Sequence, residues 1–134
     1  MKFSHLLALV ALSVPAFAHA ANYEVDPVHS SAQFAVKHMM ISTVRGEFTK
    51  LSGTAVIDDK NLAKSTVEAS IDASSISTRM DKRDEHLRSP DFLDTAKFAT
   101  IAFKSTEVKK AGEGKYKVTG NLTLHGVTKP VVLD

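Results

Sequence analysis

Residues 116–124, YKVTGNLTL, decide the fold class, because apolar and polar residues alternate along the whole stretch. One face of this extended segment would carry Tyr116, Val118, Gly120, Leu122 and Leu124. A period of two predicts a β-strand with one apolar face and one wet face. Similar alternation recurs at residues 32–37, 66–72 and 100–104, and β-rich residues occupy 54–57 and 131–133. We therefore expect an antiparallel, all-β protein.

The alternation is lost between Ser77 and Phe98, where the sequence predicts a helical insert. Thr78 is a suitable N-cap for a short helix over residues 79–87. Asp84 and Arg88 have the i,i+4 spacing of a stabilising ion pair. Ser89 and Pro90 are predicted as the N-cap and N1 positions of a second short turn through residue 94. Such an insert typically covers an end or a seam of a barrel, but periodicity alone leaves a barrel and a sandwich equally open.

The composition is that of one globular domain. The chain has 134 residues, of which 43% are hydrophobic and 24% are charged, and it contains no Cys. The lack of Cys excludes disulfides, zinc–thiolate sites and iron–sulfur sites. Lys and Arg number 17 against 15 Asp and Glu, and the two signs are interspersed. We therefore expect no nucleic-acid partner.

Residues 1–20 have the pattern of a cleavable signal peptide. Lys2 precedes an apolar run over 6–14, and Ala18-His19-Ala20 fits the small-x-small cleavage rule. The run is much shorter than the roughly 20 residues of a membrane span. A membrane anchor is therefore the weaker alternative, and no stable membrane span is expected. The prediction is a mature domain over residues 21–134, exported to a bacterial periplasm.

The residues offer no established catalytic or metal-binding motif. The histidines His29, His38, His86 and His125 lack the close spacing of paired metal ligands. No Gly-x-Ser-x-Gly elbow, phosphate loop or dinucleotide fingerprint is present. A Ser–His–Asp site gathered from distant positions stays open, because its members need not be adjacent. We predict no metal, no cofactor and no enzymatic activity.

The large apolar residues are the more suggestive feature. Alternation places Phe34, Phe103, Leu122 and Leu124 on the inner face of the sheet. In a barrel of about eight strands, such side chains either fill the interior or line a cavity for one small ligand. The residues alone leave these two outcomes open.

An ordered set of segments resembles the YceI-like family, a lipocalin-like group associated with polyisoprenoid binding. The segments are 26–30 (DPVHS), 34–38 (FAVKH), 42–48 (STVRGEF), 53–54 (GT), 83–92 (RDEHLRSPDF), 101–106 (IAFKST) and 120–130 (GNLTLHGVTKP). Each segment alone is weak, but together they run in order along the whole of residues 21–134. The resemblance implies an eight-stranded antiparallel barrel with a long apolar tunnel for a polyisoprenoid or another long-chain lipid.

The resemblance also implies site residues. The predicted tunnel lining is Phe34, Val36, Met40, Phe48, Phe92, Phe103, Leu122 and Leu124. The predicted partners of a polar head group are His38, Arg45 and Arg83, with Lys37 nearby in the sequence. In the alternative interpretation, Arg83, Asp84 and His86 form ion pairs that lock the insert onto the barrel.

The family pattern continues beyond Asp134, so we expect this chain to be C-terminally incomplete. Its barrel would then lack a closing strand and expose two sheet edges, which would allow a homodimer through those edges. The first functional hypothesis is a periplasmic carrier of a polyisoprenoid or similar amphiphile. The alternatives are a structural or stress-related module with a filled core, and an enzyme that acts on a quinone-like lipid through His38 or His86.

Overall fold

The strands of this computed structural model, which describes residues 20–134, pair only in the antiparallel sense. The signal peptide predicted for residues 1–20 lies outside the described residues, apart from Ala20. The strands are β1 (Ala21–Glu24), β2 (Ala32–His38), β3 (Ser42–Phe48), β4 (Leu51–Ile57), β5 (Thr66–Asp72), β6 (Ile76–Ser77), β7 (Thr100–Gly112), β8 (Lys115–Leu124) and β9 (Val127–Leu133). The helical elements are α1 (Asp81–Arg88) and the 3-10 turns η1 (Leu62–Lys64) and η2 (Ala73–Ser75).

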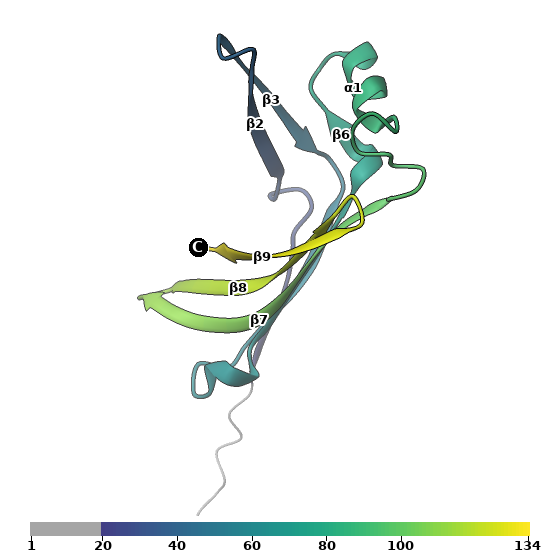
Figure 1. Ribbon diagram of the computed structural model, residues 1–134. Helices are drawn as coiled ribbons and strands as arrows, with labels where there is room; N and C mark the ends of the chain where they lie inside the picture. Colours follow the sequence, from purple (N-terminus) through teal and green to yellow (C-terminus); the bar gives the residue numbers. More distant parts are fainter. Residues whose placement is uncertain (1–19) are drawn as a thin grey trace, which may run out of the picture.

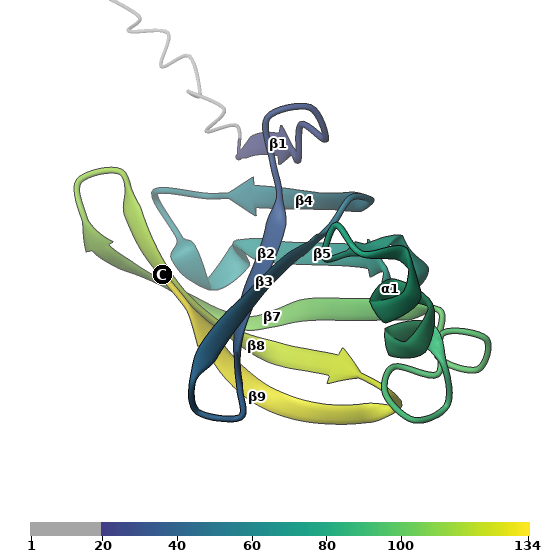
Figure 2. The ribbon, with the colours of Figure 1, turned by 90° about the horizontal axis from the view of Figure 1, so that it is seen from above.

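The strands form two sheets that continue into one another. Six strands pair in the order β1-β4-β5-β7-β8-β9, and three pair in the order β2-β3-β6. Only Thr49 and Lys50 separate β3 from β4, and only η2 separates β5 from β6. The β2–β3 hairpin therefore extends the β1–β4 pair beyond a bend, and it rises away from the six-stranded sheet (Figure 1). Viewed from above, the hairpin crosses the direction of β5, β7, β8 and β9 (Figure 2).

The predicted alternation is confirmed by the strand register. Ala69 of β5 pairs with Phe103 of β7, and Phe103 pairs with Leu122 of β8, so these side chains share one face. Gly120 makes room for the aromatic ring on this face, because a Cβ there would lie 2.4 Å from Phe103 Cζ. The buried apolar residues are Ile57, Ala73, Ile76, Ile101, Phe103 and Val108.

The antiparallel β class with one helix is confirmed, but the described strands do not form a closed barrel. In the six-stranded sheet β1 pairs only with β4, and β9 pairs only with β8. Closure would require a pairing that joins these two edges, because a barrel has no free edge. Among the described residues the six-stranded sheet is therefore open.

The helical insert differs in detail from the prediction. Helix α1 begins at Asp81, and Thr78 is not its N-cap. Instead, the Asp84 carboxylate accepts hydrogen bonds from Thr78 N at 2.8 Å and from Thr78 Oγ1 at 2.5 Å. The predicted ion pair between Asp84 and Arg88 is wrong, because Arg88 donates to the carbonyl oxygens of Ser74 and Ile76 at 2.7 and 2.9 Å.

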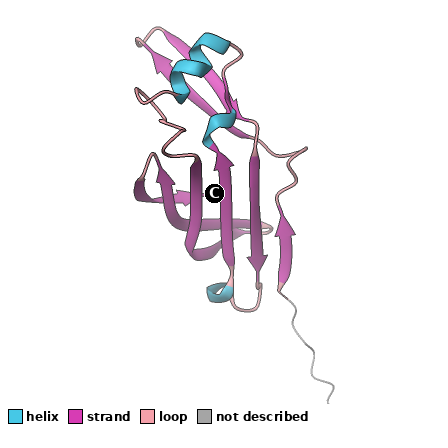
Figure 3. Ribbon diagram, turned by 90° about the vertical axis from the view of Figure 1, so that its right-hand side faces the viewer, coloured by secondary structure: helices cyan, strands magenta, loops and turns pink. Residues whose placement is uncertain are grey.

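The segment after α1 forms the predicted second turn over residues 90–93, where Asp91 N donates to Ser89 Oγ at 3.3 Å. Two backbone bonds from Phe92 and Asp94 return to the carbonyl oxygen of Ser89. The insert and the β2–β3 hairpin lie at the same end of the sheet (Figure 3). Of the helices in residues 20–134, none is both long and apolar enough to cross a membrane.

Candidate functional site: an apolar sheet face and a projecting hairpin

The pairing of the strands places apolar residues side by side on one face of the six-stranded sheet, where they form a continuous surface. One row of cross-strand neighbours runs through Gly53, Ala69, Phe103 and Leu122. An adjacent row begins with Leu51, Ile71 and Ile101. Because cross-strand neighbours lie about 4.5–5.5 Å apart, their side chains contact one another across the sheet. The small residue Ala69 leaves this surface low beside the larger Phe103 ring, whereas Val25 covers Gly53, since its Cγ2 lies 3.1 Å from where a Cβ would be.

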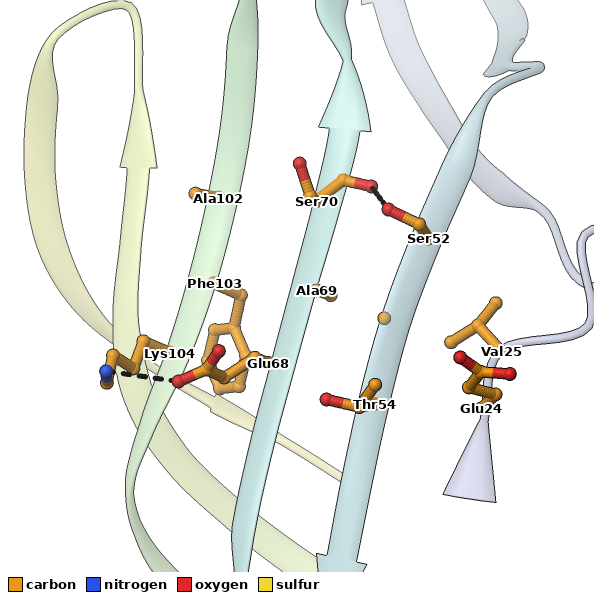
Figure 4. A pocket seen from close by; sticks show the side chains of 11 residues that line it. Glu24, Val25, Ser52, Thr54, Glu68, Ala69, Ser70, Ala102, Phe103 and Lys104 are labelled. Atoms are coloured by element: carbon orange, nitrogen blue, oxygen red, sulfur yellow. Dashed lines mark hydrogen bonds and ion pairs between the residues drawn. The ribbon is translucent and has the colours of Figure 1, made fainter. Parts of the chain in front are cut away.

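The opposite face of the same strands is polar. Lys104 Nζ lies 3.0 Å from Glu68 Oε1, and both side chains are largely exposed. Ser52 Oγ donates a hydrogen bond to the Ser70 carbonyl oxygen at 3.5 Å. These groups line a shallow, open depression together with residues of β1, β4, β5 and β7 (Figure 4). Exposed ion pairs of this kind contribute little to the stability of the fold. The polar face therefore differs from the apolar face mainly because its side chains are well hydrated.

The β2–β3 hairpin carries a second apolar surface. Phe34 pairs with Gly46, Val36 with Val44, and Ala32 with Phe48, so all of these residues share one face. The rings of Phe34 and Phe48 pack with their centroids 5.7 Å apart. The predicted tunnel residues are thus divided between two sheets: Phe34, Val36 and Phe48 lie on the hairpin, and Phe103, Leu122 and Leu124 lie on β7 and β8.

Two predicted lining residues do not join either surface. Met40 lies at the tip of the hairpin, where its positive φ of 60° turns the chain, and its side chain is exposed. Phe92 lies in the insert and packs edge-on against His86, with the ring centroids 4.9 Å apart. Both residues were predicted to line the tunnel because the sequence does not show where the hairpin turn and the insert lie relative to the sheets. The ligand-binding roles of all eight residues stay predictions.

The three predicted head-group residues do not converge. His38 shares the apolar face of the hairpin with Phe34, since His38 pairs with Ser42 and the register is unbroken. Arg45 pairs with Ala35 and therefore faces the opposite side. Arg83 is engaged within the insert: its Nε donates to Thr78 Oγ1 at 2.7 Å, and its Nη2 donates to the Thr78 carbonyl oxygen at 2.9 Å.

The ion pairs by which Arg83, Asp84 and His86 would lock the insert onto the barrel are not the contacts that these residues make. Arg83 and Asp84 fix the loop before α1 through hydrogen bonds to Thr78 rather than through ion pairs. His86 Nε2 lies 2.9 Å from Asp91 Oδ2, and both side chains are exposed. These contacts hold the insert together internally.

Sequence reasoning missed Arg79 as a neighbour of Arg45. Glu47 of β3 pairs with Ser77 of β6, which brings Arg79 close to Arg45 because each lies two residues from that pair. Both arginines line one shallow depression on the polar face of the hairpin. Arg79 has a φ of 61°, which is unusual for a residue other than glycine. Only the β3–β6 register could have indicated this pairing, and the sequence does not reveal it.

The segment 26–30 forms a local turn rather than part of a binding surface. His29 Nδ1 lies 2.7 Å from Asp26 Oδ2, and Val28 N donates to Asp26 Oδ1 at 2.8 Å. The hydrogen bond with His29, followed by that from Val28, lowers the pKa of Asp26 below its usual value. Across residues 20–134 there is no group of three or more His, Asp or Glu side chains that could hold a metal ion.

The comparison with protein families decides the relationship. The model of the YceI-like domain matches residues 23–134, which cover nearly all of the described fold. The chain belongs to the YceI-like family. A UPF0312 protein of Vibrio parahaemolyticus is 42% identical to this YceI-like chain over 127 residues, which are 93% of this chain and 67% of that protein. The chain thus spans about two thirds of the length of this relative.

Solved structures share the fold of this YceI-like domain. The crystal structure of Burkholderia cenocepacia BcnA matches with a TM-score of 0.73 and 28% identity, over 81% of this chain and 67% of that one. A polyisoprenoid-binding domain from Saccharophagus degradans, implicated in plant cell wall breakdown, matches with a TM-score of 0.61 and 19% identity, over 84% and 64% of the two chains. At that identity the second likeness concerns the fold alone.

Proposed function

We propose that this protein is a periplasmic, non-catalytic carrier that binds the tail of a polyisoprenoid or another long-chain amphiphile. One observation carries the proposal: the apolar face of the six-stranded sheet is continuous across β4, β5, β7 and β8, and its residue on β5 is the small Ala69. A hydrocarbon tail laid on such a surface gains about 0.8 kcal/mol for each methylene removed from water. No directional contact is needed, so long tails of different chemistry are accommodated.

Family membership and the apolar face support a lipid ligand, and the signal-like segment over residues 1–20 supports export. The polyisoprenoid-binding domain from Saccharophagus degradans has the same fold, which makes a polyisoprenoid the first ligand to test. Among the three head-group candidates, His38 is the one that the geometry favours, because it shares a face with the apolar residues of the hairpin. Arg45 faces the other way, and Arg83 donates through Nε and Nη2 to Thr78, which directs its guanidinium into the insert.

The experiment is native mass spectrometry of the protein isolated from the periplasmic fraction. We expect a lipid adduct that is released on denaturation. The substitution Ala69→Phe fills the low part of the apolar face and should remove most of the adduct. Ser70→Phe is the matched control, because it adds the same ring on the polar face of the same strand. Circular dichroism verifies that both variants are folded.

Three results would count against the carrier proposal. A folded wild-type protein without any adduct would favour the module with a filled core. Equal adducts in the Ala69→Phe and Ser70→Phe variants would place the lipid elsewhere on the molecule. Recovery of the protein only from the cytoplasm would contradict the proposed location.

A further inference from the structure

The tip of the β2–β3 hairpin is an exposed apolar cluster. It consists of Met39, Met40 and Ile41, whose exposed fractions are 77%, 92% and 92%. We call these three residues the apolar tip. The hairpin projects from the sheet, so the tip lies at one extremity of the molecule (Figure 1). Single exposed apolar residues are common on protein surfaces, but three consecutive large ones form a patch that favours association with another apolar surface.

Turn geometry does not explain this choice of residues. Met39 and Met40 have φ values of 50° and 60°, and Ile41 N donates to the His38 carbonyl oxygen at 3.2 Å to close the turn. Two successive residues with positive φ favour Asn and Gly, since other residues pay about 1–2 kcal/mol each for the left-handed conformation. The apolar tip therefore exposes apolar side chains to water and places unfavourable residues in a turn. Such departures from what stability favours are expected at functional positions.

The charges beside the tip have one sign. Residues 36–45 contain Lys37, His38 and Arg45 and no Asp or Glu. Among the described residues, no carboxylate lies within ion-pair distance of these three groups. Lys37 and Arg45 lie behind the tip on one face of the hairpin, and an apolar end followed by basic side chains is the arrangement by which peripheral proteins enter the interface of a bilayer that contains anionic lipids.

We propose that the apolar tip inserts into the headgroup region of an anionic lipid bilayer. Met39, Met40 and Ile41 enter the boundary between headgroups and acyl chains, and Lys37 and Arg45 approach the lipid phosphates. Methionine suits this role because its flexible, polarizable side chain adapts to a disordered environment. The interaction goes beyond the proposed function, since docking through the tip requires no lipid on the sheet face.

Vesicle flotation tests the proposal. The exported protein is mixed with vesicles of phosphatidylcholine alone or of phosphatidylcholine with phosphatidylglycerol. Intact mass spectrometry first establishes where the purified protein begins, because an uncleaved apolar leader would itself bind vesicles. We expect wild-type protein to float with the anionic vesicles and to be released by salt.

The decisive variant combines Met39→Asn with Met40→Gly. This pair removes the apolar side chains and matches the preference of the turn, so the hairpin keeps its fold. We expect the double variant to partition into anionic vesicles about tenfold more weakly than the wild type, because it has lost two large apolar side chains. Val28→Asn is the matched control: Val28 is 82% exposed but lies in a different loop, and its loss should leave binding unchanged.

A second measurement reports the location of the tip directly. The chain contains no Trp, so Met40→Trp introduces a single fluorophore. Its emission should shift to shorter wavelength on addition of anionic vesicles, whereas Val28→Trp should not respond. Failure of the wild-type protein to float, or equal flotation of the double variant, would overturn the proposal. Loss of self-association in the double variant without any vesicle binding would assign the tip to a contact between two copies instead.

Discussion

Asp84 should be the most sensitive position in the insert, because its buried carboxylate holds the loop that precedes α1. The carboxylate accepts from both the amide nitrogen and the hydroxyl of Thr78, at 2.8 and 2.5 Å. The same hydroxyl accepts from Arg83 Nε at 2.7 Å, so three residues form one connected network. Thr78 and Asp84 are both buried. Asp84→Ala would therefore leave two donors of Thr78 without an acceptor in a place that excludes water.

Each buried donor left without a partner costs about 1–3 kcal/mol. Two donors give an expected loss of about 3 kcal/mol in the free energy of unfolding, since the hydroxyl can partly turn toward another acceptor. Urea unfolding followed by circular dichroism measures this loss through the midpoint and the slope of the transition. Asp84→Asn keeps one acceptor oxygen and should lose less.

Asp81→Ala is the matched control. Asp81 lies in the first turn of the same helix and is exposed, so it contributes at most about 1 kcal/mol through the helix dipole. If Asp84→Ala destabilises the protein no more than Asp81→Ala does, the network is not the element that fixes the insert, and the reasoning is refuted.

Two further predictions concern the sheet and the first loop. Gly120→Ala should destabilise the protein by about 1–3 kcal/mol in urea unfolding, because the new Cβ would meet Phe103 Cζ at 2.4 Å and the Lys104 carbonyl oxygen at 2.5 Å; an unchanged midpoint would show that the ring does not rest on Gly120. The pKa of Asp26 is lowered from 3.8, so its contribution to stability is present above that pH and is lost as the pH falls through the folded-state pKa. Titration by NMR should show that His29→Ala raises the pKa of Asp26 and that His125→Ala does not, and equal shifts in both variants would contradict the pairing with His29.

The sequence predicted the faces of the strands better than their lengths. Alternation indicated a strand over 100–104, yet β7 extends from Thr100 to Gly112. The register shifts between Ser105 and Glu107, which changes the face to which the later residues point. A bulge of this kind breaks the period of two while the pairing continues, so pattern analysis ends the strand too early. The apolar row through Phe103 and Leu122 was predictable because no shift interrupts it.

The site was harder to predict because it depends on register between strands. His38 and Arg45 lie on either side of a turn, and whether they share a face depends on how many residues the turn contains. The positive φ values of Met39 and Met40, which set that turn, are not encoded by any Asn or Gly. Likewise, Thr78 and Asp84 looked like a helix cap and half of an ion pair, and only the loop geometry shows that they bind each other.

The order of strands along the six-stranded sheet has a consequence for how the chain acquires its structure. From β4 onward, spatial neighbours follow the order of the chain, with β5 beside β4, then β7, β8 and β9. Contacts between segments close in sequence form quickly, because little chain entropy is lost in closing short loops. In a chain that emerges N-terminus first, each of these strands would find its neighbour in the sheet already present. The six-stranded sheet can thus assemble strand by strand from β4 toward β9, and at each stage the next strand adds to the edge that is still unpaired.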